Sequence, residues 1–372
     1  MGQMDNKTKK IRWCKPEIGE IEHKLVKQVL DNHFPNESKL TESFEEEICK
    51  LIGCKHALAV TNGTSAMFLS LKALGIGPED EVIVPDITFI ATANAVEMTG
   101  AKPILVDIDP KTLTLNPNTF EKAITEKTKA VIPVHVSGRA ADMDKIMSIA
   151  ERNDIHVIED AAEAFMSKYK EKCLGTFGKT GCFSFSPPKI ITTGQGGAII
   201  TNDDELYIRL RELKDQGRPK RGTGGDDIHA SIGYNFKFTD LQAAVGLGQL
   251  AYIKQRMEKT KRIYELYSEG LQNTKGITVF NFNVKEGELP LWTDAIVEKR
   301  DELDKYVLSN GIECRRFWFP IHTQKPYRLA DDNFPNSTSL SKKALWLPSS
   351  YTLSDEDITE VCSHIRNFLK EN

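Results

Sequence analysis

The sequence has no long apolar run, no metal-binding spacing of histidines and no paired cysteines, and each absence excludes a class of protein. No uncharged apolar stretch approaches the roughly 18 residues that a membrane helix needs, so we expect no membrane-spanning segment. The eight histidines form no HExxH or similar spacing, so we expect no metal site. The segment Met1–Lys10 is polar and rich in lysine and lacks the apolar core of a signal peptide.

The cysteines and the net charge indicate the compartment and the partners of the protein. The seven cysteines are scattered and none forms a CxxC pair, so we expect free thiols and a cytoplasmic protein. The formal net charge of −4 gives no general reason to expect nucleic acid or an anionic membrane as a partner. The basic runs Lys7–Arg12 and Arg218–Arg221 are interpreted as solvated segments or small-ligand contacts, and Lys220 and Arg221 are candidates for contact with a substrate.

What the sequence does contain is a regular alternation of strand and helix patterns over about its first 220 residues. Five short runs rich in apolar residues end at Gly, Pro, Asn or Asp, as strands should. They are His56–Val60, Glu81–Val84, Pro103–Val106, Ala130–Val134 and Ile155–Ile158. Helical patterns lie between them, at Thr64–Leu74, Ile90–Met98, Asn118–Ile124 and Asp142–Arg152. This order predicts βαβ units and an α/β fold whose mostly parallel central sheet is covered on both faces.

A different pattern begins near residue 239. Thr239–Leu271 predicts one long helix, with Thr239 and Asp240 suited to cap its start. Shorter elements follow, at Ile277–Phe280, Arg300–Ser309, Ile312–Phe317 and Ser354–Leu369. We therefore expect a large domain of residues 1–250 and a smaller α+β C-terminal domain of residues 251–372, with a helix shared between them.

Four features lie where predicted strands end, which is the edge at which open α/β sheets bind ligands. The first is Thr61–Ser65, whose small residues let N–H groups and hydroxyls approach a phosphate at a helix N-terminus. The same residues also favour a simple turn and helix cap. The second is Glu159-Asp160, where a carboxylate either caps the next helix or pairs with the protonated ring nitrogen of a pyridine cofactor.

The other two features are a lysine and an aromatic. Lys189 lies in the proline-stiffened, glycine-rich stretch Ser184–Gly197, where burial would lower the pKa of its amine and favour Schiff-base chemistry. The alternative is a lysine that reaches solvent from a loop. Phe89 either stacks on a planar cofactor or packs in the core. Together the four features supply what pyridoxal phosphate requires, and few other cofactors need all of them.

These motifs resemble those of a known family, the DegT/StrS-type nucleotide-sugar aminotransferases, which have the fold type I of aspartate aminotransferase. The resemblance runs from about Pro16 to Ile365. In chain order its motifs are Asn62-Gly-Thr-Ser-Ala66, Glu81-Val-Ile-Val-Pro85, Thr88-Phe89, Ala91-Thr-Ala-Asn94, Glu159-Asp-Ala-Ala162, Phe183-Ser-Phe185 with Lys189, Thr192-Thr-Gly-Gln-Gly-Gly197, Gly233-Tyr-Asn-Phe236 and Asp240-Leu-Gln242.

The resemblance implies a role for each motif residue. Lys189 would carry pyridoxal 5′-phosphate as a Schiff base, Asp160 would pair with the pyridinium nitrogen, and Phe89 would stack on the ring. Asn235 matches an asparagine that reaches the phosphate from a neighbouring subunit, which implies a homodimer with shared active sites. Glu163 stands where many members have Gln or His near the ring hydroxyl. The positions that match the phosphate site are Gly63, Thr64, Ser65 and Ser184.

The implied reaction is the amination of a nucleotide-linked keto sugar for cell-surface glycans. L-glutamate would leave as 2-oxoglutarate, with pyridoxamine 5′-phosphate between the two halves. Glu159–Ala164 and Ile190–Thr193 are similar to GDP-perosamine synthases, which aminate C4 of a GDP-linked 4-keto-6-deoxymannose. Asn32–Ser38 and Val136–Arg139 depart from the family pattern, so the sugar and the nucleotide stay open. His322 resembles part of a family loop near the substrate, and a structural role is its alternative.

Other functions stay open. Amination at C3, or another pyridoxal-phosphate reaction on a sugar, is compatible with the same cofactor motifs. Members with His in place of the lysine act as sugar dehydratases, and the presence of Lys189 favours transamination. A non-catalytic regulator or binding protein is the alternative of another class, and the retained lysine argues against it.

Overall fold

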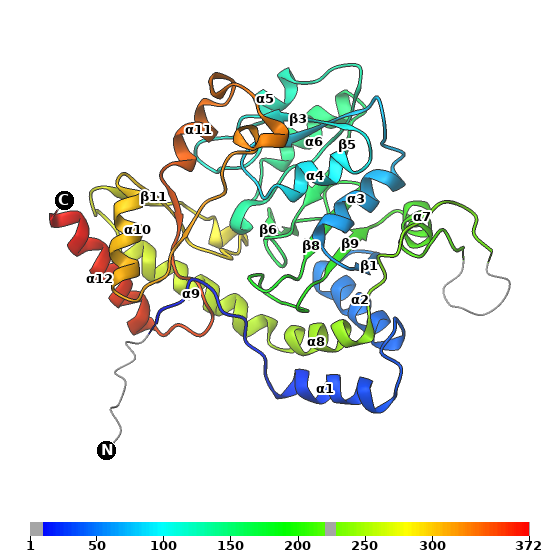
Figure 1. The fold of residues 1–372 in the computed structure, drawn as a ribbon, viewed down its shortest axis with the longest axis horizontal. Helices are drawn as coiled ribbons and strands as arrows, with labels where there is room; N and C mark the ends of the chain where they lie inside the picture. Colours follow the sequence, from blue (N-terminus) through cyan, green and yellow to red (C-terminus); the bar gives the residue numbers. More distant parts are fainter. Residues whose placement is uncertain (1–9, 220–227, 372) are drawn as a thin grey trace.

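A seven-stranded sheet is the centre of the computed structural model, which describes residues 10–219 and 228–371 (Figure 1). Its strand order is β1-β9-β8-β5-β4-β2-β3. The bounds are β1 His56–Val60, β2 Glu81–Pro85, β3 Lys102–Val106, β4 Thr128–Val131, β5 His156–Asp160, β8 Thr180–Ser184 and β9 Gly197–Thr201. Strands β3, β2, β4, β5 and β8 run parallel, and β9 is antiparallel to both of its neighbours. The predicted, mostly parallel sheet is therefore confirmed.

Both faces of this sheet are buried. Successive side chains of a strand point to opposite sides, and apolar side chains on each side pack under helices. On β5, Val157 packs into one core cluster and Ile158 into the other. The helices that cover one face of the sheet contribute Phe44, Ile146 and Ala243 to the first cluster. They are α2 (Lys39–Ile52), α6 (Met143–Arg152) and α8 (Asp240–Ala251). The second cluster is covered by α3 (Gly63–Ala73), α4 (Ala91–Glu97) and α7 (Asp204–Lys214).

A second, antiparallel sheet follows in the C-terminal part of the chain, in the order β10-β11-β13-β12. Its strands are β10 Ile277–Val279, β11 Asp294–Val297, β12 Arg315–Arg316 and β13 Ala344–Trp346. A third core cluster joins it to helices at the end of the molecule opposite α7 (Figure 1). These helices are α9 (Ile253–Gly270), α10 (Arg300–Ser309) and α12 (Asp355–Glu371). Ile11 also enters this cluster and forms a bridge with Ile312.

The remaining helices are α1 (Glu20–Asp31), α5 (Pro117–Lys122) and α11 (Pro335–Ser341), and β6 (Lys168–Tyr169) pairs with β7 (Lys172–Cys173). Trp292 and Trp346 lie in the same cluster as central-sheet residues, so the two predicted domains share part of one core. Their boundary at residue 250 stays a prediction. No helix in the described ranges is long and apolar enough to cross a membrane. All seven cysteines are free.

Three predicted elements differ from the structure by more than a shift of one or two residues at an end, or in their continuity. The single helix predicted over Thr239–Leu271 is wrong, because Tyr252 has a backbone φ of −103° and ψ of 7° that separates α8 from α9. The predicted strand Ala130–Val134 begins at Thr128 and ends at Val131, two residues before Pro133, which has no N–H to donate to a ladder. The strand predicted at Ile312–Phe317 is reduced to Arg315–Arg316.

Candidate active site

A pocket of about 290 Å³ lies at the carboxyl ends of the central strands. It receives side chains from the segments that follow β1, β2, β5 and β8, where the sequence predicted a ligand site. Seven of the predicted residues line it, and they are Gly63, Thr64, Phe89, Asp160, Glu163, Ser184 and Lys189. The structure therefore brings together residues that are up to 126 positions apart in the chain.

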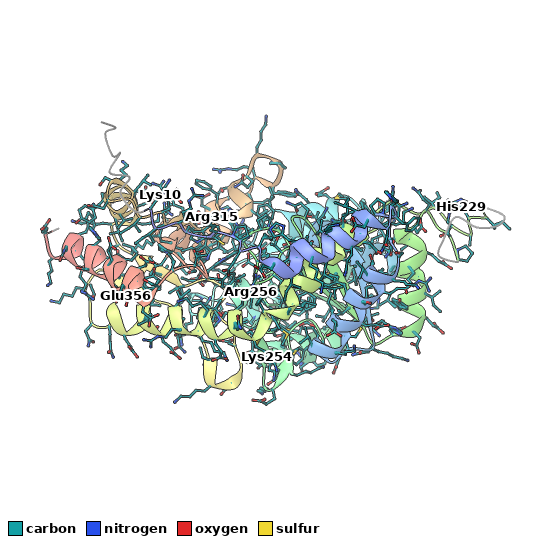
Figure 2. All side chains as sticks on the ribbon, turned by 90° about the horizontal axis from the view of Figure 1, so that it is seen from below. Lys10, His229, Lys254, Arg256, Arg315 and Glu356 are labelled. Atoms are coloured by element: carbon teal, nitrogen blue, oxygen red, sulfur yellow. The ribbon has the colours of Figure 1, made fainter. Side chains whose placement is uncertain are left out.

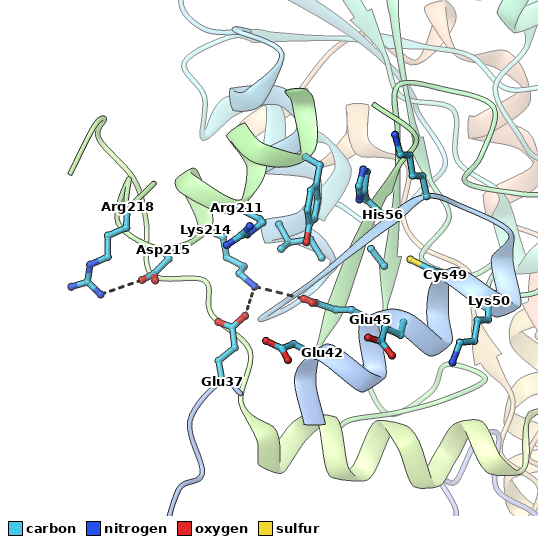
Figure 3. A pocket seen from close by; sticks show the side chains of 15 residues that line it. Glu37, Glu42, Glu45, Cys49, Lys50, His56, Arg211, Lys214, Asp215 and Arg218 are labelled. Atoms are coloured by element: carbon cyan, nitrogen blue, oxygen red, sulfur yellow. Dashed lines mark hydrogen bonds and ion pairs between the residues drawn. The ribbon is translucent and has the colours of Figure 1, made fainter. Parts of the chain in front are cut away.

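A larger hollow of about 660 Å³ lies elsewhere, between α2, α7 and the free edge of β1 (Figure 3). Both acidic and basic side chains line it, and Lys214 forms buried ion pairs with Glu37 at 2.6 Å and Glu45 at 3.8 Å. Lys214 also donates to the carbonyl of Ala59, on the strand edge. These bonds hold α2, α7 and β1 together, and none of the predicted cofactor residues lines this hollow.

The N-terminus of α3 faces the smaller pocket. Asn62 caps the helix by accepting the N–H of Ser65 at 2.8 Å, and the Ser65 hydroxyl donates back to the Asn62 carbonyl at 2.8 Å. Ser65 therefore has the capping role and does not line the pocket, whereas Gly63 and Thr64 do. A Cβ atom on Gly197 would lie 2.5 Å from the Asn62 carbonyl carbon, so only glycine lets β9 approach this turn. The exposed N–H groups of such a helix start favour an anion.

Asp160 ends β5 at the base of the pocket and is 5 % exposed. The Thr92 hydroxyl donates to one of its carboxylate oxygens at 2.8 Å, and the Ala162 N–H donates to the other at 3.2 Å. Burial raises the pKa of the Asp160 carboxyl, and the two hydrogen bonds oppose that rise. A cation that enters the pocket beside Asp160 would therefore stabilise the ionised carboxylate.

The end of β5 is fixed by a second, fully buried carboxylate. Glu159 accepts the N–H groups of Gly175, Phe177 and Gly178 at 2.6–2.8 Å. It also contacts Nε2 of His135 at 3.0 Å, and Nδ1 of the same ring accepts the Ala141 N–H. This arrangement assigns the His135 proton to Nε2 and makes Glu159 a structural anchor for its neighbour Asp160.

Lys189 points its amine into the pocket and lies next to an acid. Its Nζ is 3.0 Å from Oε1 of Glu163 and 4.9 Å from the centre of the Trp292 ring. The other carboxylate oxygen of Glu163 accepts the Ser137 N–H at 2.9 Å. Ser137 has a φ of +55°, a left-handed conformation that non-glycine residues seldom adopt, and its hydroxyl accepts from Trp346 Nε1. Glu163 is thus held in place to face the lysine.

Phe89 is 55 % exposed although it lies against a pocket that is lined by buried groups. Its neighbour Thr88 is buried and contacts the Thr92 hydroxyl, so the backbone around Phe89 is fixed. Core packing, the alternative for Phe89, does not occur. Its ring is instead available for stacking on a planar ligand.

Sequence reasoning missed an aromatic wall on one side of this pocket. All four tryptophans of the chain gather here, with ring centres of contacting pairs 4.8–6.0 Å apart. They come from widely separated segments and are Trp13, Trp292, Trp318 and Trp346. Arg315 lies over two of these rings and also lines the pocket. The only sequence signal was the rarity of tryptophan, which spacing alone does not place.

Other predicted residues lie outside the pocket. Asn235 is exposed and bridges to Asp215, so a role at the phosphate of a neighbouring subunit stays a prediction. His322 is fully buried, with Nδ1 2.6 Å from Asp86 and its ring stacked on Phe334. Its structural alternative therefore fits the geometry, and His322 does not reach the pocket as predicted for a substrate contact. Lys220 and Arg221 lie outside the described residues. The described part of the chain has no cluster of metal-ligating side chains.

The residues that do line the pocket fit pyridoxal phosphate. A lysine amine is present for a Schiff base, a buried carboxylate for a ring nitrogen, an exposed aromatic face for the ring, and a helix start for the phosphate. The fold and this site thus define a pyridoxal-phosphate-dependent transferase.

The family model described as DegT/DnrJ/EryC1/StrS aminotransferase matches residues 16–366, and the chain belongs to this family. GDP-perosamine synthase of Escherichia coli O157:H7 is 36 % identical over 361 residues, which cover 96 % of this chain and 98 % of that protein. DesV of S. venezuelae, solved with a ketimine intermediate, has a TM-score of 0.89 and 30 % identity over 96 % of this chain and 99 % of its own. The PLP form of Spr1654 from Streptococcus pneumoniae has a TM-score of 0.92 and 25 % identity, covering 98 % and 99 %. The predicted fold type I, the aminotransferase activity and the pyridoxal phosphate cofactor are confirmed.

Proposed function

We propose that this aminotransferase moves an amino group from L-glutamate to the keto carbon of a nucleotide-linked 4-keto-6-deoxy sugar, as a perosamine-type synthase. The observation that carries the proposal is Lys189, whose amine enters a pocket together with Asp160 and Phe89. The sugar is supported by the similarity to GDP-perosamine synthases over almost the whole chain. The product would be an amino sugar for cell-surface glycans, and the cytoplasmic location stays a prediction.

When bound, pyridoxal phosphate supplies a carbonyl that condenses with amines and a ring that accepts an electron pair. The amine of Lys189 would hold the cofactor and, once displaced, move a proton to or from the carbon that gains or loses the amino group. Asp160 would keep the ring nitrogen protonated. Gly63, Thr64 and Ser184 would surround the phosphate at the start of α3. The same residues serve both halves, so one site turns glutamate into 2-oxoglutarate and the keto sugar into an amino sugar.

Glu163 would assist Lys189 in this proton transfer. Its carboxylate lies 3.0 Å from the amine, and the Ser137 N–H holds it there. A fixed acceptor beside the amine limits the directions in which the freed lysine can turn. By the family resemblance, Asn235 would complete the phosphate site from the second subunit of a homodimer; within its own chain it lies outside the pocket.

The decisive experiment has two stages. Purified protein is first treated with borohydride and digested, and mass spectrometry is expected to find the reduced cofactor on the peptide that contains Lys189. The enzyme is then incubated with glutamate and nucleotide-linked 3-keto and 4-keto sugars, and the expected amino product comes from the GDP-linked 4-keto-6-deoxymannose. Amination of a 3-keto sugar alone would replace the C4 assignment. A protein without a visible cofactor band and without turnover would instead be a binding protein of this fold.

A further inference from the structure

The end of α2 brings two cysteines together. The helix ends at Gly53, which has a left-handed φ of +78°, and the Cys54 N–H then donates back to the Cys49 carbonyl at 3.3 Å. A hydrogen bond of this kind across a left-handed glycine is the Schellman motif, in which the two bonded residues also meet through their side chains. The two thiols accordingly form a hydrogen bond with each other. A disulfide requires such closeness, with Cα atoms within about 7 Å.

Helix α2 presents Cys49 to the free edge of β1. Glu45, one turn earlier on the helix, accepts the Ala59 N–H at 2.8 Å, and the Cys49 sulfur accepts the Ala57 N–H. The Cys49 sulfur therefore has two donors, which are the Ala57 N–H and the Cys54 thiol. Both donors stabilise a negative charge on the Cys49 sulfur.

Cys49 differs in this respect from the other cysteines. The hydrogen bond from Cys54 lowers the pKa of the Cys49 thiol, while burial and the carboxylates of Glu45 and Glu46 oppose that change. The same hydrogen bond raises the pKa of the Cys54 thiol, which donates it. Burial raises the thiol pKa of the other five cysteines, which are Cys14, Cys173, Cys182, Cys314 and Cys362. Because the thiolate is the form that oxidants attack, Cys49 is expected to react first.

Cys49 is also accessible from outside the active site. It is half-buried and lines the hollow of about 660 Å³ at the free edge of β1 (Figure 3). In Figure 2, α2 lies in the half of the molecule that carries His229, and Arg315, which lines the lysine pocket, lies in the other half. Neither Cys49 nor Cys54 lines the lysine pocket. A small oxidant therefore reaches Cys49 without passing the catalytic residues.

We propose that Cys49 and Cys54 are a modification site at which hydrogen peroxide forms a reversible disulfide. The Cys49 sulfur attacks one peroxide oxygen, the O–O bond breaks and one water leaves, so that Cys49 becomes a sulfenic acid. The Cys54 sulfur then attacks the Cys49 sulfur, an S–S bond forms, and the hydroxyl leaves with the Cys54 proton as a second water. The two sulfurs lose two electrons, which reduce the peroxide to water. Dithiothreitol returns two electrons and two protons and restores both thiols.

A third thiol near this pair offers a competing disulfide. Cys173 on β7 is buried, and its charge acts on Cys54. Cys49 and Cys54, in contrast, share both a backbone hydrogen bond and a thiol hydrogen bond. The disulfide between Cys49 and Cys54 is therefore the expected product.

Trypsin distinguishes these pairs, because Lys50 lies between Cys49 and Cys54. Holoenzyme is treated with hydrogen peroxide, its remaining thiols are blocked with iodoacetamide, and the protein is digested without reductant. We expect a cross-linked species that joins peptide 40–50 to peptide 51–55 and that dithiothreitol separates. The thiol count of the unfolded protein should fall from seven by the two thiols of this pair and recover fully after dithiothreitol.

Serine variants assign the role of each thiol. In Cys54→Ser the sulfenic acid of Cys49 has no partner, so dimedone, which reacts with sulfenic acids, should label peptide 40–50. Cys49→Ser should lose thiols at least about tenfold more slowly than wild type, and the matched control Cys173→Ser should form the disulfide as wild type does. A serine hydroxyl can also accept the Ala57 N–H, so Cys49→Ser should fold, which circular dichroism checks.

Three results would overturn the proposal. They are a wild type that keeps all seven thiols in peroxide, a cross-link that joins Cys54 to Cys173, and a Cys49→Ser variant that loses thiols as fast as wild type. None of these measurements depends on the amino donor or on the sugar, so they test the thiol pair separately from the proposed function.

Discussion

Lys189 and Lys214 are both largely buried lysines paired with glutamate, yet they stand in two very different regions. Lys214 meets two glutamates and a carbonyl of the strand edge, and its exposed side-chain fraction is 5 %. Lys189 meets one glutamate and the face of a tryptophan, and the rest of its surroundings is an open pocket. A buried ion pair alone therefore does not mark an active site. What distinguishes Lys189 is that its hydrogen bonding is incomplete and that it faces a pocket.

The largest effect on activity is expected from removal of the Lys189 amine. Lys189→Ala should reduce transamination by at least about 10³-fold, because the covalent link and the proton carrier are lost together. Its unfolding temperature should stay near that of cofactor-free wild type. Turnover is measured with glutamate and the keto sugar, and calorimetry checks the fold. Wild-type turnover by this variant would refute the proposed mechanism.

Asp160→Asn should have opposite effects on turnover and on the stability of the cofactor-free fold. We expect turnover to fall about 10²-fold, because the ring nitrogen loses its anionic partner. Burial raises the folded-state pKa of Asp160 above its ordinary value of 3.8, so the ionised side chain destabilises the cofactor-free fold. This cost grows as the pH rises from 3.8 through the raised pKa and is then constant.

Cofactor-free Asp160→Asn should consequently unfold at a higher temperature than wild type at pH 7, and the difference should shrink as the pH falls toward 3.8. Added pyridoxal phosphate should stabilise wild type more than the variant, since only wild type pairs with a protonated ring. Scanning calorimetry with and without cofactor measures both effects. Equal stabilisation of the two proteins would place the ring nitrogen away from Asp160.

Lys214→Met should affect stability and leave the chemistry unchanged. Removal of the cation leaves Glu37 and Glu45 buried without it, which costs about 3–5 kcal/mol of the free energy of unfolding. Urea unfolding measures the loss, and the double variant with Glu37→Gln should recover part of it. The remaining folded enzyme should show the wild-type cofactor band. Loss of that band in folded protein would make the charged hollow part of the active site.

Glu163→Gln is expected to have the smallest effect. A glutamine can accept the Ser137 N–H and remain close to the Lys189 amine, so turnover should change by less than about tenfold. Steady-state kinetics over pH 6–9 would test it, and a loss comparable to that of Lys189→Ala would make Glu163 essential.

The sequence predicted the parallel sheet and seven residues of the pocket because both depend on local patterns. Short apolar runs and the turns that follow them are read within a few residues, and parallel strands then bring their ends together. The break at Tyr252 was missed because Thr239–Leu271 has a helical pattern throughout. The tryptophan wall and the burial of His322 depend on contacts between residues far apart in the chain. His322, for example, contacts Asp86, which lies 236 positions away in the chain, and no local sequence pattern predicts this pair.

The tryptophan wall also has a consequence for biosynthesis. It combines Trp13 with Trp346, which lies 333 positions later in the chain. All strands of the central sheet precede residue 202, so that sheet is able to form while the ribosome is still making the rest. The wall beside Lys189 is complete only once the chain has been made as far as residue 346. A nascent or truncated chain that ends before residue 346 would therefore carry Lys189 without the complete aromatic wall of its pocket.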